Sequence, residues 1–185
     1  MTKTIHIKNM VCNRCKTVLK QELEAIGVEI INVELGKVTF KINSEIDLST
    51  IKKIVDTNGF EVILDDNELI LEEIKIALIL LLDKSNDESL SSYLTKKIGR
   101  EYSSLSKLFS KKEGITIEKY FINLKVEKAK EFIQMGNLNF SEIAYSLGYK
   151  NSSHLAQQFK TITGMSMSDY KNIKNWERKP FDQII

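Results

Sequence analysis

The stretch that decides the fold is Asn139–Gly164, NFSEIAYSLGYKNSSHLAQQFKTITG. Apolar residues recur at helical spacing on both sides of Gly148, which supplies a turn where a positive φ costs least. Asn139, followed three residues later by Glu142, is the pattern of a capping box at the start of the first helix. Two short helices joined through a glycine form a helix-turn-helix, a shape that fits the DNA major groove.

The chain carries this unit twice. The pattern L-x3-F-x4-G-x5-Y runs from Leu105 to Tyr120 and again from Leu155 to Tyr170. Because a repeated motif is stronger evidence than a single one, we expect two helix-turn-helix units, over about 90–114 and about 139–164. An amphipathic helix over about 117–134 would bridge them. At about 27 Å, that helix is long enough to hold two recognition helices one DNA turn apart.

The double motif resembles the AraC/XylS family of transcription regulators. The matching pieces are SLSKLFSKKEG, IEKYFINLKVEKAKEF and SEIAYSLGYKNSSHLAQQFKTITGMSMSDYK, which together cover about half of the chain. One departure is Met167, where the family usually has proline. The resemblance implies an all-α DNA-binding domain over 67–185. It also implies double-stranded DNA and RNA polymerase as partners, with a homodimer as an option.

Candidate DNA-contacting residues can be read from each recognition helix. If its Leu and Phe face the core, the residues on the opposite side face outward. The outward positions are small or polar, which allows backbone contact, and Gln157 is suited to reading adenine with two hydrogen bonds. The family pattern places base contacts at the same positions. The candidates are Ser103, Ser104, Ser106, Lys107 and Ser110 in the first helix, and Ser152, Ser153, His154, Gln157 and Lys160 in the second.

Residues 1–66 are predicted to form a separate small domain. Alternating apolar residues indicate strands, and apolar residues at helical spacing indicate two helices between them. The expected order βαββαβ is that of the ferredoxin-like fold, which makes the chain a two-domain α+β protein. The expected strands are Thr4–Lys8, Val28–Leu35, Val38–Ile42 and Phe60–Leu64, and the expected helices are Cys12–Ile26 and Ser49–Asn58.

This domain resembles the heavy-metal-associated domain of copper chaperones and metal-pumping ATPases. NMVCNRC matches that family's M-x-C-x-x-C loop, and NGFEVIL resembles its last loop and strand. The resemblance implies a metal site at Cys12 and Cys15, and soft thiolates favour Cu(I) or another thiophilic ion. Asn9 stands where the family usually has glycine, and Phe60 where bacterial relatives often have tyrosine.

Other readings of the two cysteines remain open. A thioredoxin-like redox pair is one, although the proline loop of that fold has no counterpart near the cysteines. A structural zinc site would want four ligands, and the only histidines are His6 and His154. The cysteines could also be remnants on a docking module. Met10 is expected to pack beneath the loop rather than to act as a third ligand.

A strongly apolar helix is expected over Glu68–Lys84, joining the two domains. We interpret it as the first helix of the DNA-binding unit. It carries more apolar surface than one partner needs, so the N-terminal domain or a second chain is an alternative contact.

Charge is distributed unevenly. Residues 89–185 hold 16 Lys and Arg against 9 Asp and Glu, a net of +7, whereas residues 1–66 hold 9 against 10. The positive excess therefore falls on the half that would need it to bind phosphates. No apolar run is long enough to cross a membrane, and the chain begins without a signal peptide, so a cytoplasmic location is expected. No catalytic constellation was found, so an enzyme is not expected.

The sequence thus predicts a sequence-specific transcription regulator that responds to metal through Cys12 and Cys15. The alternatives are a metal-independent activator with an N-terminal docking domain, and a copper metallochaperone.

Overall fold

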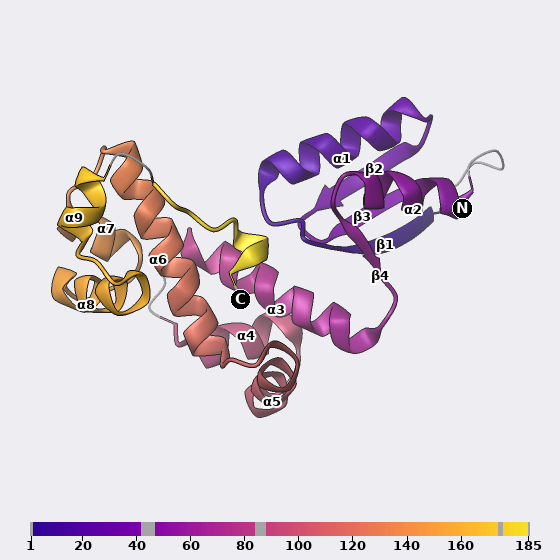
Figure 1. Ribbon diagram of the computed structural model, residues 1–185. Helices are drawn as coiled ribbons and strands as arrows, with labels where there is room; N and C mark the ends of the chain where they lie inside the picture. The colour runs from indigo at the N-terminus through magenta and orange to yellow at the C-terminus, as the bar shows by residue number, and fades with distance from the viewer. Residues whose placement is uncertain (1, 42–46, 84–87, 174–175, 185) are drawn as a thin grey trace. The chain divides into compact units, whose positions relative to one another are not determined.

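The computed structural model describes residues 2–41, 47–83, 88–173 and 176–184. The chain divides into two compact units, Met1–Ile76 and Ala77–Ile185. The first unit contains a small antiparallel sheet with two helices, and the second is helical (Figure 1). The elements are β1 (Thr2–Lys8), α1 (Asn13–Ala25), β2 (Glu29–Glu34), β3 (Lys37–Lys41), α2 (Leu48–Thr57), β4 (Glu61–Ile63), α3 (Asp66–Leu82), α4 (Leu90–Ile98), α5 (Tyr102–Glu113), α6 (Ile117–Met135), α7 (Phe140–Ser146), α8 (Ser152–Thr163), α9 (Met167–Asn172) and the 3-10 helix η1 (Phe181–Gln183).

The sheet of the first unit has the strand order β2-β3-β1-β4, and all neighbouring strands are antiparallel. Alternate residues of β1 and β3 point into the core, where Ile7 and Phe40 are fully buried. Helix α1 adds Leu19 and Leu23 to this core, and α2 adds Val55. The order βαββαβ therefore matches the order that the apolar pattern predicts.

Strand ends differ from the prediction by one or two residues. The last strand, β4, is shorter than expected because it is an edge strand whose pairing with β1 covers only Glu61 to Ile63. Leu64, just beyond it, is 86% exposed. The third strand, β3, ends at Lys41, and the predicted end Ile42 lies outside the described residues.

Helix α3 spans the division between the two units. The sequence placed the domain boundary at 66/67, whereas the compact units separate after Ile76. Two contacts account for the difference: the Glu72 carboxylate accepts a hydrogen bond from the backbone N–H of Asn9, and the Ile76 side chain lies against Gly36. The first turns of α3 therefore belong with the sheet, and its last turns with the helical unit. The expected helix end, Lys84, lies outside the described residues.

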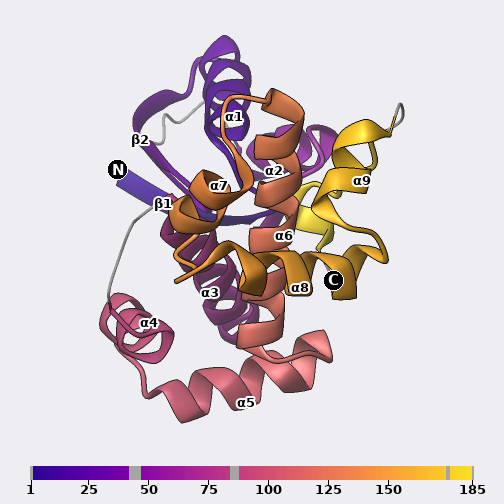
Figure 2. The same cartoon turned by 90° about the vertical axis from the view of Figure 1, so that its left-hand side faces the viewer.

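The helical unit is built around α6, which contacts α5, α7, α8 and α9, while α4 packs against α5 (Figures 1 and 2). A glycine with φ of 74° follows the first helix of each pair: Gly99 is the C-cap of α4, and Gly148 comes directly after Leu147, the C-cap of α7. The predicted capping box is present at Asn139, whose side chain accepts from the N–H of Glu142 while Glu142 accepts from the N–H of Asn139.

Met167, the expected proline position, is the first residue of α9 and is buried. The first turn of a helix is where proline is tolerated best, because that N–H has no partner within the helix. Ser166 and Asp169 form a capping box there, which supplies the start signal without proline.

Candidate nucleic-acid interface and dithiol loop

The second recognition helix, α8, presents the predicted polar residues to solvent. Leu155 and Phe159 are fully buried, which fixes the rotation of the helix. The Asn151 side chain caps it by accepting a hydrogen bond from the N–H of His154 at 3.0 Å. Among the predicted contact residues, Ser153, His154, Gln157 and Lys160 are exposed and Ser152 is half-buried.

The first recognition helix, α5, repeats this arrangement with Leu105 and Phe109 buried. Here Ser103, Ser104 and Lys107 are exposed, whereas Ser106 and Ser110 are half-buried. No side-chain hydrogen bond caps the helix at Glu101. The two helices therefore share an inward face and differ in their N-terminal caps.

Three residues that the sequence reading did not select hold the turn before α8. The Tyr149 hydroxyl donates a hydrogen bond to Gln158 Oε1 at 2.5 Å. Lys125 of α6 places its ammonium 4.8 Å from the centroid of the Tyr149 ring and 4.7 Å from that of Phe121. Burial lowers the pKa of Lys125 and raises the pKa of Tyr149 to about 12. Of the neighbours Gln157 and Gln158, only the first is thus exposed for contact with DNA.

A groove of about 390 Å³ lies between α6 and α8. It brings the predicted contact residues His154 and Gln157 beside Lys119 of α6. An ammonium beside two base-reading candidates suits an anionic backbone that passes along the helix. The lining residues are Lys119, Ile122, His154, Gln157, Gln158, Thr161 and Ile162.

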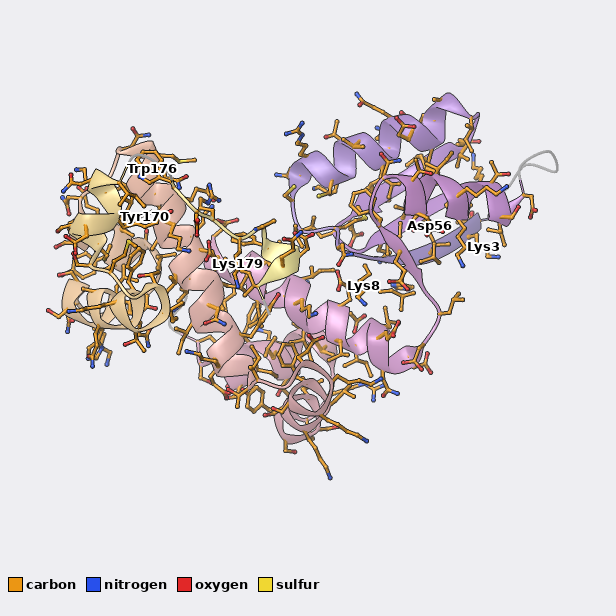
Figure 3. All side chains as sticks on the ribbon, viewed as in Figure 1. Lys3, Lys8, Asp56, Tyr170, Trp176 and Lys179 are labelled. Carbon is orange, nitrogen blue, oxygen red and sulfur yellow. The ribbon has the colours of Figure 1, made fainter. Side chains whose placement is uncertain are left out.

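The C-terminal segment is tied to α6 by a buried carboxylate that the sequence did not reveal. Glu127 is 5% exposed and accepts from Lys130 Nζ at 2.7 Å and from the backbone N–H of Lys179 at 2.9 Å. The Tyr170 hydroxyl donates to the Glu177 carbonyl at 3.1 Å, and Figure 3 labels Tyr170 and Lys179 on this segment. Spacing along one helix gives no sign of a partner 52 residues away, so the pattern carried no signal for it.

The two cysteines meet at the start of α1. Cys12 is the N-cap residue in extended conformation, Cys15 lies in the first turn, and their Sγ atoms are 3.2 Å apart. Asn9 has a φ of 71°, making it the one described residue other than glycine in the left-handed region. Asparagine tolerates that region, so it can stand where the resembling family has glycine. Met10 is fully buried in the core, as expected for a residue that packs beneath the loop.

The two thiols differ in acidity. Burial opposes ionisation of Cys12, but hydrogen bonds from the backbone and thiol of Cys15 and from the Arg14 backbone, with the Arg14 charge, lower its pKa overall. Burial and the hydrogen bond to Cys12 raise the pKa of Cys15. A thiol at a helix N-terminus beside a cation is the usual setting of a reactive cysteine.

The donor set fits a soft ion held by two thiolates. The sulfur separation of 3.2 Å is shorter than the span of a linear complex, which is roughly twice a metal–sulfur bond of about 2.3 Å. Cys12 is exposed, so the two sulfur atoms have room to separate to that span. Among the described residues, no group of three or more His, Cys, Asp and Glu side chains is placed to hold a metal ion, and His6 lies half-buried in β1.

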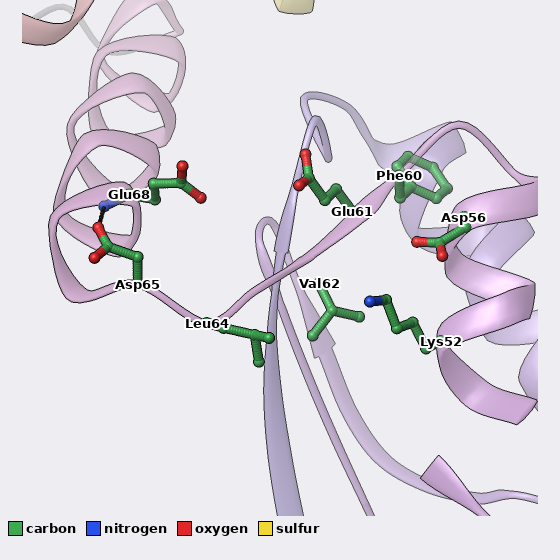
Figure 4. A pocket seen from close by; sticks show the side chains of 8 residues that line it. All are labelled: Lys52, Asp56, Phe60, Glu61, Val62, Leu64, Asp65 and Glu68. Carbon is green, nitrogen blue, oxygen red and sulfur yellow. Dashed lines mark hydrogen bonds between the residues drawn. The ribbon is translucent and has the colours of Figure 1, made fainter. Parts of the chain in front are cut away.

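The first unit has a hollow of its own, which runs along the edge strand β4 (Figure 4). Its apolar part is made by Phe60, Val62 and Leu64, and its rim carries mostly acidic side chains. Asp65 caps α3 here by accepting from the N–H of Glu68 at 3.0 Å, the dashed line in Figure 4. The lining residues are Lys52, Asp56, Phe60, Glu61, Val62, Leu64, Asp65 and Glu68.

Residues 94–173 match a family described as helix-turn-helix domain. The chain is 28% identical over 83 residues to the Msm operon regulatory protein of Streptococcus mutans, covering 44% of this chain and 30% of that protein. It is 30% identical over 70 residues to an HTH-type transcriptional regulator, YtdP, of Bacillus subtilis, covering 38% of this chain and 9% of that protein. The chain thus spans less than a third of either relative.

Among solved structures, the chain is similar to the transcriptional regulator CdpR from Pseudomonas aeruginosa, with a TM-score of 0.50 and 15% identity. The match covers 92% of this chain and 55% of that chain, and at this identity it concerns the fold alone. The family match places a helix-turn-helix domain over the part of the chain that contains α5 to α8. Within the described residues, no helix has both the length and the apolar character needed to cross a bilayer.

Proposed function

We propose that the protein is a sequence-specific transcription regulator that binds double-stranded DNA through α5 and α8 and responds to a thiophilic metal ion through Cys12 and Cys15. The observation that carries the DNA-binding part is the duplicated helix-turn-helix with equivalent buried and exposed positions on both recognition helices. The excess of positive charge on residues 89–185 supports the same conclusion.

In this proposal, the exposed residues of α5 and α8 read two neighbouring major-groove segments. Gln157 is assigned to a base edge because its amide is exposed, whereas Lys107 and Lys160 supply charge toward guanine or phosphate. RNA polymerase is the expected partner on the promoter, and a homodimer would extend the operator. A cytoplasmic location follows from a DNA-bound role.

The metal response rests on the first unit. The βαββαβ order and the strand order β2-β3-β1-β4 support a ferredoxin-like domain of the heavy-metal-associated type. The dithiol at the head of α1 supplies two soft ligands for Cu(I), and lowering of the Cys12 pKa favours the thiolate that such an ion needs. A coupling of about 1–3 kcal/mol between metal and DNA would be ordinary for two linked sites.

The test is DNA selection from a random library with reduced protein, with and without Cu(I) under anaerobic conditions. We expect one enriched sequence, whose affinity changes when Cu(I) is bound by wild type but not by the Cys12→Ser/Cys15→Ser variant. If no sequence is enriched in either condition, the DNA-binding proposal is wrong. If one sequence is enriched and its affinity is the same with and without Cu(I), the metal response is wrong and the DNA-binding part of the proposal stands.

A metal-independent regulator with an N-terminal docking domain is the second candidate. The hollow along β4 favours it, because Leu64 is 86% exposed beside Phe60 and Val62. Under this candidate, Leu64→Ser would abolish promoter activation in a transcription assay while leaving DNA affinity and Cu(I) binding unchanged. Metal-dependent operator affinity would speak for the first proposal instead.

A further inference from the structure

Glu72 is one of two charged residues that are buried among the described residues. It lies outside the DNA interface and outside the segment from Asn9 to Cys12 that leads into α1, which we call the dithiol loop. Its side chain, 5% exposed on α3, accepts a hydrogen bond from the backbone N–H of Asn9 at 2.9 Å. The partners are 63 residues apart in sequence. Burying a carboxylate is costly unless it is hydrogen-bonded, so this bond is a strong constraint on the Asn9 backbone.

Asn9 begins the loop that leads through Met10 to Cys12. Asn9 has a left-handed φ of 71°; its N–H bonds to Glu72 of α3, and the next residue, Met10, enters the core with no exposed surface. The loop is thus held at two consecutive positions, one by apolar packing and one by Glu72. The position of Cys12 relative to Cys15 depends on both, because Cys12 follows Met10 by two residues.

The same helix has a second contact with this end of the sheet. A Cβ on Gly36 would lie 2.3 Å from Ile76 Cδ1, so the Ile76 side chain fills the space that only glycine leaves open in the turn between β2 and β3. The Gly36 carbonyl accepts the N–H of Ile7 at 2.9 Å, just before the dithiol loop. Glu72 and Ile76 lie one helical turn apart, so one face of α3 reaches both the loop and its neighbouring turn.

We infer that Glu72 is the positioning residue of the dithiol loop, and that α3 is the element through which the state of Cys12 and Cys15 is transmitted along the chain. The second part rests on the proposed metal response. A metal that draws Cys12 away from its 3.2 Å contact with Cys15 moves the backbone that Glu72 holds. Since α3 continues past Ile76 into the last turns assigned to the helical unit, a shift at Glu72 has a covalent route toward the DNA-binding half.

The first measurement uses the full-length, metal-free protein. Amide hydrogen exchange at Asn9 is compared with exchange at Ile7, whose N–H is bonded to the Gly36 carbonyl rather than to Glu72. We expect Glu72→Ala to speed exchange at Asn9 by about tenfold or more relative to Ile7, and Glu72→Gln, which keeps the acceptor oxygen, to restore most protection. Glu73→Ala, at an exposed position on the same helix, should change neither amide.

Cu(I) affinity, measured by competition with a chelator, is the second readout. Loss of an outer residue that orients a ligand typically costs 10- to 100-fold in metal affinity, so Glu72→Ala should weaken binding by about tenfold. Asn9→Gly keeps both the N–H and the left-handed backbone and should bind as wild type does. In wild type, Cu(I) should alter amide exchange in α3, and this change should vanish in Glu72→Ala.

The outcomes separate the inference from the proposed function. Equal exchange ratios in wild type and Glu72→Ala would overturn the positioning role, as would unchanged Cu(I) affinity in that variant. An affinity loss in Asn9→Gly as large as in Glu72→Ala would also overturn it, because the side chain rather than the N–H would then hold the loop. If wild type binds no Cu(I) through the cysteines, the metal response and its transmission through α3 fail together, and the exchange ratio alone decides whether Glu72 positions the loop.

Discussion

The rings of Phe109 and Tyr120 meet edge to face, with centroids 5.4 Å apart and an interplanar angle of 61°. Phe159 and Tyr170 repeat this contact at 5.4 Å and 72°. In each half, a recognition helix is thereby locked by its buried phenylalanine to a tyrosine of the helix that follows. The repeated pattern L-x3-F-x4-G-x5-Y therefore corresponds to the same Phe–Tyr contact made once in each half of the helical unit.

This pairing predicts a coupling energy that is confined to each half. In a double-mutant cycle, Phe159→Leu and Tyr170→Leu should show an interaction of about 0.5–1.5 kcal/mol in the free energy of unfolding, as edge-to-face aromatic pairs do. The control combines Phe109→Leu with Tyr170→Leu, whose effects should add. Urea denaturation measures both cycles. A coupling of equal size between Phe109 and Tyr170, which belong to different halves, would contradict the claim that each Phe–Tyr pair acts within its own half.

Neighbouring glutamines of α8 should separate DNA reading from folding. Gln157 is exposed, so Gln157→Ala should weaken specific DNA binding by about 1–3 kcal/mol and relax one base position while leaving stability unchanged. Gln158→Ala removes the acceptor of the Tyr149 hydroxyl and should lower the free energy of unfolding by about 1–3 kcal/mol. Fluorescence anisotropy on operator and random DNA checks the first variant, and equal loss on both would argue against base reading.

Removal of the buried carboxylate on α6 should loosen the C-terminal segment. Glu127→Ala leaves Lys130 and the Lys179 N–H without their acceptor and should cost about 3–5 kcal/mol of stability. Glu131→Ala is the matched change one turn along, where the carboxylate pairs with the side chains of Lys128 and Arg178 and with no backbone N–H, and it should cost less, about 1 kcal/mol. Thermal unfolding and proteolysis near residue 176 provide the comparison. Similar losses in the two variants would show that burial of Glu127 adds nothing.

Alkylation should distinguish the two thiols by pH. Because the pKa of Cys12 is lowered and that of Cys15 is raised, Cys12 keeps a thiolate fraction as pH falls below the usual thiol value of about 8.5, where Cys15 has already become protonated. Iodoacetamide rates followed by peptide mass spectrometry should therefore show a lower pH midpoint for Cys12. Arg14→Gln should raise that midpoint, since it removes the favourable charge, whereas Lys52→Gln in α2 serves as a distant control. A lower midpoint for Cys15 would reverse the assignment.

The sequence by itself determined the elements and their periodicity. Buried positions such as Leu155 and Phe159 could be predicted because helical spacing depends only on local geometry, and the capping box at Asn139 involves residues three apart. The proximity of Cys12 and Cys15 followed for the same reason, since both lie at one helix start. Whether the predicted serines, Gln157 and Lys160 contact DNA remains a prediction.

Only the tertiary structure decided the long-range polar contacts. Glu72 and Glu127 look like ordinary surface residues of amphipathic helices, yet both are buried against backbone N–H groups more than fifty residues away in sequence. The division of the chain inside α3 has the same origin, because it depends on which side chains reach Asn9 and Gly36. Whether a carboxylate is buried depends on one partner elsewhere in the chain. Such a single long-range contact does not repeat at a fixed spacing, so the sequence pattern cannot predict it.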